Sequence, residues 1–157
     1  MSSQIVQEVV HATCIAVGGK GILLLGPPGS GKSDLALRLI DTPGQGIGTA
    51  EFEAQLVADD QVKLTRVGNE LQAAAPDALA GLLEVRGLGL VRVKNLASIR
   101  VDLCVKLRPH SEIERLPELA AQHYSALGLR LPLIEIDPTA ASAPARVRAG
   151  VHHLFSP

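Results

Sequence analysis

Short apolar and alternating runs follow one another along most of the chain, and they predict a protein rich in short β-strands. Gly68-Asn69 separates two of these runs and predicts a hairpin, while residues 82–93 predict a loop followed by a further strand. Pro132 cannot donate a ladder hydrogen bond, so its strand is expected at a sheet edge or to begin there. The other predicted strands cover residues 9–17, 21–25, 56–58, 62–67, 71–74, 99–107 and 131–136.

Helical periodicity is confined to two segments. Residues 34–40 form an apolar-rich run after a glycine-rich stretch, and residues 142–155 predict a final helix. Ser142 is the expected N-cap of that helix, and a proline follows in its first turn. The apolar face of the final helix carries Val147, Val151 and Leu154. Single helical turns are expected within residues 76–80 and 111–119, and a surface loop at 41–55.

Composition favours a layered fold. Hydrophobic residues make up 46% of the 157 residues, but aromatic residues only 2%, so the core must be built from Leu, Val, Ile and Ala. Such a core suits a buried parallel or mixed sheet covered by helices. The length corresponds to a single domain over residues 1–157.

Net charge and targeting signals limit the classes of partner and the cell compartment that are expected. A formal net charge of −1 gives no general attraction to nucleic acids or acidic membranes. The N-terminus has no secretory pattern and no apolar run reaches the ~20 residues of a bilayer span, so a cytoplasmic protein without membrane contact is expected. Cys14 and Cys104 lie in apolar runs and fit no metal spacing, so buried free thiols are expected.

The most specific motif fits G-x-x-x-x-G-K-[ST], the phosphate-binding loop (P-loop) of nucleotide enzymes, and lies between a predicted strand and a predicted helix. Its glycines let backbone N–H groups surround a polyphosphate, and the helix N-terminus adds unpaired donors. With the strand pattern, it predicts an α/β fold with a P-loop kinase-type mixed sheet and flanking helices. The expected nucleotide-binding residues are Gly26, Pro27, Pro28, Gly29, Ser30, Gly31, Lys32 and Ser33.

Acidic residues elsewhere could complete a phosphoryl-transfer site. Asp59 and Asp60 follow an apolar strand, where P-loop enzymes commonly place a metal or water ligand, and neighbouring strand residues point to opposite faces. Glu84 and Arg86 share a face if their segment is extended, so they could meet Mg²⁺ and phosphate. Solvated turn carboxylates and a surface ion pair are the alternative interpretations.

Three segments, in order, carry a resemblance to a known family: VHATCIAV, then GPPGSGKS, then LVADD followed by LLEVRGLGLVRV. They resemble the catalytic domain of HPr kinase/phosphorylase, the bacterial P-loop enzyme that modifies a serine of the phosphocarrier protein HPr. The similarity runs from about Val9 to Arg115, whose E-R-L segment aligns with the family's D-R-L, and weakens afterwards. Longer members carry an extra N-terminal domain, so this chain is expected to resemble the short forms.

The resemblance implies the catalytic residues. Asp59 is implied as the general base that accepts the serine proton, and as the acid of the reverse reaction. Lys32 is implied as the cation that neutralises the transferring phosphoryl group, with Arg115 as a second cation. His11 corresponds to an active-site histidine, and a hydrogen-bonded histidine at a strand end is the alternative interpretation.

The resemblance also implies the ligands and partners. Ser33 and Glu84 are implied as Mg²⁺ ligands, while Asp60 and Arg86 hold secondary positions of the signature. ATP is the implied phosphoryl donor and an HPr-type carrier the implied acceptor. A homo-oligomer, often a hexamer in this family, is also implied.

One departure from the family concerns the reverse reaction. Members carry a basic R-P-G-R-N-type loop after a strand near the C-terminus, tied to phosphorylase activity. Here residues 137–141 read DPTAA, which leaves Arg146 and Arg148 on the next helix as the candidates to replace those cations. The kinase direction therefore follows better than the phosphorylase direction. Residues 41–55 also form a longer link than is usual in the family.

The leading prediction is an ATP- and Mg²⁺-dependent protein-serine kinase that acts on HPr or a related phosphocarrier of the sugar or nitrogen phosphotransferase system. A small-molecule P-loop kinase is one alternative, but no arginine-rich lid is visible in the sequence. A nucleotide-gated regulatory module is another, and retention of Asp59, Glu84 and Arg115 argues against it.

Overall fold

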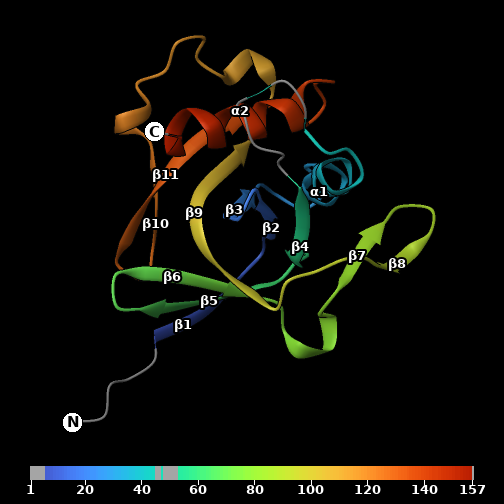
Figure 1. Cartoon of the computed structure of the whole chain (residues 1–157). Coiled ribbons are helices and arrows are strands. Elements are labelled where there is room, and N and C mark those ends of the chain that lie inside the picture. The colour runs from blue at the N-terminus through green and yellow to red at the C-terminus, as the bar shows by residue number, and fades with distance from the viewer. Residues whose placement is uncertain (1–5, 45–46, 48–52, 157) are drawn as a thin grey trace.

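The chain is organised around one long, curved strand, β9 (Ser98–Leu107), in a computed structural model that describes residues 6–44, 47 and 53–156 (Figure 1). The other strands are β1 (Val6–Val10), β2 (Thr13–Val17), β3 (Lys20–Leu25), β4 (Ala54–Ala58), β5 (Val62–Val67), β6 (Glu70–Ala74), β7 (Leu82–Val85), β8 (Gly89–Arg92), β10 (His123–Ala126) and β11 (Leu129–Ile136). The helices are α1 (Lys32–Asp41) and α2 (Ala143–Phe155), with 3₁₀ turns η1 (Asp77–Leu79), η2 (His110–Glu112) and η3 (Leu119–Ala121).

Strand β9 joins two parts of a mixed sheet. It runs parallel to β3, antiparallel to β6 near its start, and parallel to β11 near its end. Beyond β3 the sheet continues through β2 to β4, and beyond β6 through β5 to β1, while β7 and β8 form a separate hairpin that projects from the body (Figure 1). This architecture confirms the predicted α/β fold with a mixed sheet and flanking helices.

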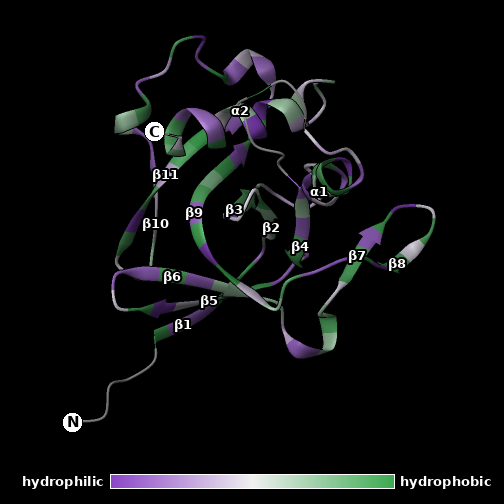
Figure 2. Cartoon of the chain, viewed as in Figure 1, coloured by the Kyte–Doolittle hydropathy of each residue, from purple (hydrophilic) through white to green (hydrophobic). Residues whose placement is uncertain are grey.

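Two apolar cores lie on opposite faces of the central strands. The first packs under the helices and includes Leu24, Leu35 and Val147, while the second lies under β5 and β6 and includes Leu64 and Leu71. Both helices carry hydrophobic as well as hydrophilic residues (Figure 2), as is typical of an amphipathic helix that covers a core. The cores are almost entirely aliphatic, as the composition predicted. No helix in the described part of the chain is long and apolar enough to cross a membrane.

An irregularity in β9 allows its side chains to serve both cores. Gly21 of β3 faces Val101, but the next residue, Ile22, faces Leu103, so Asp102 is an extra residue on β9. A bulge of this kind changes which face the following side chains occupy. Val101 accordingly packs in the second core, whereas Leu103 packs in the first.

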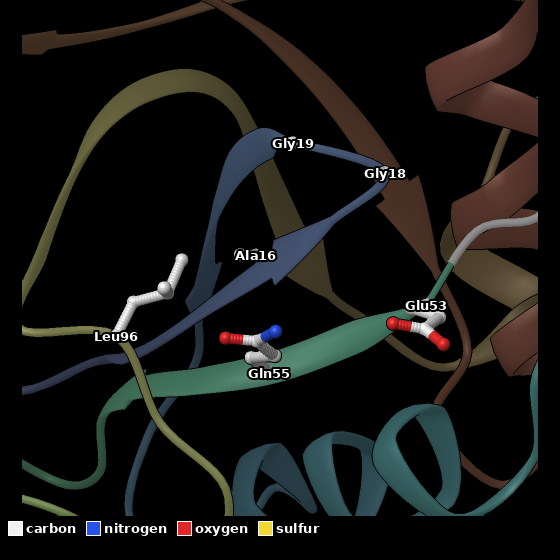
Figure 3. A pocket seen from close by; sticks show the side chains of 6 residues that line it. All are labelled: Ala16, Gly18, Gly19, Glu53, Gln55 and Leu96. Carbon is white, nitrogen blue, oxygen red and sulfur yellow. The ribbon is translucent and has the colours of Figure 1, made fainter.

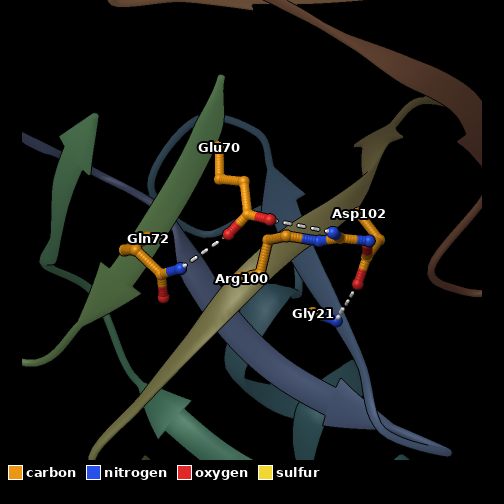
Figure 4. Close-up of polar contacts among 5 residues, drawn as sticks. All are labelled: Gly21, Glu70, Gln72, Arg100 and Asp102. Carbon is orange, nitrogen blue, oxygen red and sulfur yellow. Dashed lines mark hydrogen bonds and ion pairs between the residues drawn. The ribbon is translucent and has the colours of Figure 1, made fainter. Parts of the chain in front are cut away.

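A polar cluster stabilises this bulge (Figure 4). The buried Asp102 carboxylate accepts a hydrogen bond from the Gly21 backbone N–H at 3.1 Å and pairs with Arg100 Nη2 at 2.8 Å. Arg100 also pairs with Glu70 of β6 at 3.2 Å. Gly21 has no substitute here, because a Cβ atom would lie 2.1 Å from the Arg100 carbonyl oxygen. The cluster therefore joins three strands where the regular ladder is interrupted.

Several sequence-based strand predictions need correction. The predicted strand at residues 9–17 is two strands, β1 and β2, because they pair with different partners and the chain bends at His11. The predicted loop and strand at 82–93 form the β7–β8 hairpin. Strand β10 was not predicted; it pairs with β11. Strand β4 includes the end of the predicted loop 41–55, and residues 45–46 and 48–52 of that loop lie outside the described residues.

The helix ends and the cysteines give mixed outcomes. Helix α1 begins at Lys32, before the predicted start. Ser142 is the N-cap residue of α2, as predicted, but its Oγ accepts a hydrogen bond from Arg146 Nε at 2.9 Å and does not cap a backbone N–H group. Cys14 and Cys104 are buried free thiols, as predicted. Burial raises the pKa of both thiols, to about 12 for Cys104, so both stay protonated and unreactive at neutral pH.

Replacing Asp102 with alanine should lower the free energy of unfolding by about 1–3 kcal/mol, because the Gly21 N–H would be left buried without an acceptor. Urea denaturation measures this change. Glu70→Ala is the matched control: it removes the other, exposed carboxylate partner of Arg100 and should cost less than about 1 kcal/mol. Equal losses in the two variants would contradict the role given to the bulge.

Candidate phosphate-binding and catalytic site

Residues 26–31 form a tight turn between the end of β3 and the start of α1, which is the context that the P-loop motif requires. Gly29 and Gly31 adopt φ of 79° and 100°, a left-handed conformation that other residues rarely accept. No side chain caps the start of α1, so its first backbone N–H groups remain available to an anion. The Ser30 Oγ atom is also buried without a partner beside this turn. These features fit a phosphate chain.

Lys32 is held against the loop that it serves. Its Nζ donates hydrogen bonds to the carbonyl oxygens of Gly26 at 2.6 Å and Pro27 at 3.0 Å. An ammonium group has three donors, so one is left for a phosphate oxygen. Burial lowers the pKa of Lys32, while the nearby charges of Asp60 and Asp59 act in the opposite direction. The neighbouring carboxylates thus help to keep this lysine charged.

The Asp59 carboxylate joins three elements. It accepts hydrogen bonds from Thr13 Oγ1 of β2 at 2.9 Å, from Ser33 Oγ of α1 at 2.6 Å, and from the Glu84 backbone N–H of β7 at 2.9 Å. Asp59 is only 6% exposed. Its two oxygens are therefore committed to positioning the P-loop helix and the projecting hairpin.

Asp60 has a different environment. Its φ is 66°, and its side chain is exposed and lines a cavity of about 910 Å³ beside the P-loop. That volume is in the range of small-molecule sites. The cavity is lined by Thr13, residues 28–34, Leu37, Asp60, residues 84–87, Gly89, Pro138 and Thr139.

The oxygen atoms at this cavity suit a magnesium ion shared with a polyphosphate. Mg²⁺ binds through one or two protein oxygens and takes its remaining ligands from phosphates and water. Ser33 Oγ uses its proton on Asp59, so its lone pairs are available to a cation. The cavity is lined by Ser33, Glu84 and Asp60, so the oxygen ligands that Mg²⁺ needs from the protein are present.

The structure brings some predicted site residues together and leaves others apart. The same cavity is lined by residues 28–33 of the P-loop and by Asp60, Glu84 and Arg86. His11 is exposed in the bend between β1 and β2, and Arg115 is exposed between η2 and η3. Neither is among the residues that line the cavity.

Several residues that line the cavity were not among the predicted site residues, including Thr13, Pro138 and Thr139. Thr13 gave no signal of its own, although it lies within the VHATCIAV segment. Pro138 and Thr139 occupy the position where the resemblance led us to look for arginines. A Cβ atom on Gly31 would lie 3.3 Å from Pro138, so this segment touches the P-loop directly.

The two arginines considered as substitutes for the basic loop have other partners. Arg148 is buried, and its Nη2 donates to the carbonyl oxygens of Leu39 at 2.8 Å and Thr42 at 2.5 Å. It thereby binds the C-terminal end of α1. Arg146 contacts Ser142 at the start of its own helix. Neither lines the cavity.

A second hollow, of about 320 Å³, lies beside the β2–β3 turn (Figure 3). Its polar side chains are Glu53 and Gln55, and no lysine, arginine or helix start from the described part of the chain belongs to its lining. It therefore lacks what a phosphate ligand needs. The lining residues are Ala16, Gly18, Gly19, Glu53, Gln55 and Leu96.

The fold and the site together define a P-loop domain with a cavity suited to a polyphosphate. A family model described as "HPr Serine kinase C-terminal domain" matches residues 3–147, and the chain belongs to this family. It is 36% identical over 141 residues to HPr kinase/phosphorylase of Cupriavidus necator, covering 83% of this chain, and 38% identical over 144 residues to that of Burkholderia lata, covering 85%. The chain spans only 40–41% of the length of these two relatives.

A solved structure supports the fold assignment. The Hpr(Ser) kinase/phosphatase from Coxiella burnetii superposes with a TM-score of 0.76 at 24% sequence identity. The match covers 93% of this chain and 95% of that one. The two proteins therefore share a fold over most of this chain.

Asp59→Asn should lower the free energy of unfolding by about 1–3 kcal/mol, because an amide cannot accept hydrogen bonds on both of its ends and one buried donor loses its partner. Asp60→Asn is the matched control, and it should change stability by less than about 0.5 kcal/mol because Asp60 is exposed and asparagine tolerates its positive φ. Thermal and urea unfolding of the pair measure the difference. If the two variants are equally stable, Asp59 does not have the proposed role of holding β2, α1 and β7 together.

Proposed function

We propose that this chain is the catalytic domain of an ATP- and Mg²⁺-dependent protein-serine kinase that phosphorylates HPr or a related phosphocarrier. The observation that carries the proposal is the meeting of a P-loop with Asp60, Glu84 and Arg86 at one cavity. Membership of the HPr serine kinase family supports the acceptor class. HPr itself is proposed as the acceptor from the names of the relatives, which are longer proteins than this chain.

The chain's own residues supply positioning and charge. Lys32 and the N–H groups at the start of α1 hold the outer phosphates of ATP. A loose phosphoryl transition state needs this kind of electrostatic stabilisation more than covalent help. Arg86 lines the same cavity, where it could contact the transferring group or balance the charge of Glu84.

Ser33 and Glu84 are the residues that would hold Mg²⁺. When bound, the ion neutralises charge on the phosphate oxygens of ATP. Asp59 fixes both ligands, because it bonds the Ser33 hydroxyl and the backbone of Glu84. The P-loop helix and the hairpin are thereby kept in register across the cavity.

Asp60, rather than Asp59, is the carboxylate that we propose to accept the proton of the acceptor serine. Its side chain lines the cavity, whereas both oxygens of Asp59 already accept hydrogen bonds from buried or partly buried donors. A general base must reach the proton that it removes. The resemblance implied the opposite division within the pair, and a pair of variants separates the two.

The kinase direction is favoured over the phosphorylase direction. Phosphorolysis brings inorganic phosphate beside a phosphoserine and so concentrates negative charge in one pocket. Within the described residues, the cations that line the cavity are Lys32 and Arg86, and the arginines of α2 contact other groups. Roles for His11 and Arg115 stay predictions, because both would have to act from outside the cavity lining.

Incubation with Mg-ATP and purified HPr-type carriers, followed by mass spectrometry of the carriers, tests the function directly. We expect phosphate on one serine, and a loss of at least ~10²-fold in rate for Lys32→Ala, because one preorganised donor at the transferring group is worth that much. Transfer to a small molecule instead would support the small-molecule kinase. Nucleotide binding without turnover on any acceptor would indicate a regulatory module.

Asp60→Asn should lower serine phosphorylation by ~10²–10⁴-fold while the affinity for ATP stays within about threefold, since proton removal from the acceptor contributes nothing to nucleotide binding. Asp59→Asn should instead weaken nucleotide and Mg²⁺ binding along with stability. Steady-state kinetics and calorimetric ATP titration of both variants give the comparison. An active Asp60→Asn enzyme would indicate that Asp59 is the general base.

A further inference from the structure

One wall of the nucleotide cavity comes from residues 137–141, a turn between β11 and α2. Pro138 and Thr139 line the cavity, and Pro138 lies against Gly31 of the P-loop. The wall therefore touches both the ligand space and the loop that binds phosphate. Its position must affect the shape of the site.

The turn is fixed from inside by Asp137. One carboxylate oxygen accepts hydrogen bonds from Thr139 N–H at 2.8 Å and Thr139 Oγ1 at 2.7 Å, and the other accepts from His110 N–H at 2.9 Å. These bonds, the hydroxyl of Thr139 first, lower the pKa of Asp137, so the carboxylate stays ionised at neutral pH. The bonds define the shape of the turn, but they do not attach it to the P-loop helix.

That attachment is made by Arg38 of α1. Its guanidinium donates to the carbonyl oxygen of Pro138 and, at 3.4 Å, to that of Ala140. It also forms an ion pair at 3.0 Å with Asp34, which lines the cavity one helical turn earlier. Arg38 thus connects two parts of the cavity lining without lining the cavity itself.

We propose that Arg38 is a positioning residue for nucleotide binding, which holds the 137–141 wall against the P-loop and draws the Asp34 carboxylate away from the phosphates. This proposal rests on the proposed function for its kinetic consequence. Charge-assisted hydrogen bonds to backbone carbonyls are among the stronger ones in proteins, so their loss should release the turn. A released wall would be re-ordered each time a nucleotide binds, and that cost appears in affinity.

The test compares Arg38→Gln with Arg66→Gln. Arg66 makes equivalent bonds, to the carbonyl oxygens of Gly68 and Leu127 at 2.9 Å each, but in turns that do not line the cavity. For Arg38→Gln we expect backbone amides of residues 139–143 to exchange hydrogen about tenfold faster, because at least one charged hydrogen bond is lost. The KM for ATP should rise about five- to tenfold with kcat within about twofold, the signature of lost binding rather than lost chemistry. Arg38→Lys should recover part of both effects, and Arg66→Gln should show neither.

The outcomes separate this inference from the proposed function. Hydrogen exchange and calorimetric binding of Mg-ATP test the role of Arg38 in holding the wall, and neither needs a phosphorylated carrier. If no carrier is phosphorylated, only the kinase assignment fails. Unchanged exchange and ATP affinity in Arg38→Gln would overturn the inference, as would the same changes in Arg66→Gln. Should Arg38→Gln fail to fold, Asp137→Ala releases the same turn from inside and must give the same faster exchange and weaker ATP binding.

Discussion

The buried carboxylate of Asp59 is the interaction on which the arrangement of the site depends. Three donors from β2, α1 and β7 converge on it, and these elements are not neighbours in sequence. Among the described residues, the β7–β8 hairpin has no ladder pairing with the main sheet, so this contact and the packing of Leu83 and Val85 against the first core help to position it. A buried acceptor with three donors is costly to disturb. This contact helps to place Glu84 and Arg86 at the same cavity as the P-loop.

The bulge in β9 provides the frame for that contact. Because Asp102 interrupts the register between β3 and β9, the strand can supply side chains to two cores and bend between them. Strand β3 ends directly at the P-loop, so its register with β9 sets where the loop begins. Gly21 is required by close approach to the Arg100 carbonyl oxygen, a constraint that differs from the turn requirement of Gly29 and Gly31.

Sequence could predict the parts of this molecule that local pattern determines. The P-loop and its flanking strand and helix carried their own signals, and so did β9. The division between β1 and β2 could not be predicted, because the apolar pattern continues through the bend at His11 and only pairing with different strands separates them. The position of Arg115 outside the cavity, and the contrast between Asp59 and Asp60, likewise depend on tertiary contacts that no local pattern encodes.

The charges around the cavity explain why a divalent cation belongs to the proposed chemistry. Among the residues that the structure describes, its lining carries two cations, Lys32 and Arg86, and three carboxylates, Asp34, Asp60 and Glu84. This leaves a formal charge of 2 − 3 = −1 before any polyphosphate binds. Like charges at close range in a partly dry site cost several kcal/mol. Pairing of Asp34 with a neighbouring arginine removes one carboxylate from this balance, but Asp60 and Glu84 remain. We therefore expect a polyphosphate to enter this cavity together with a cation that these carboxylates attract.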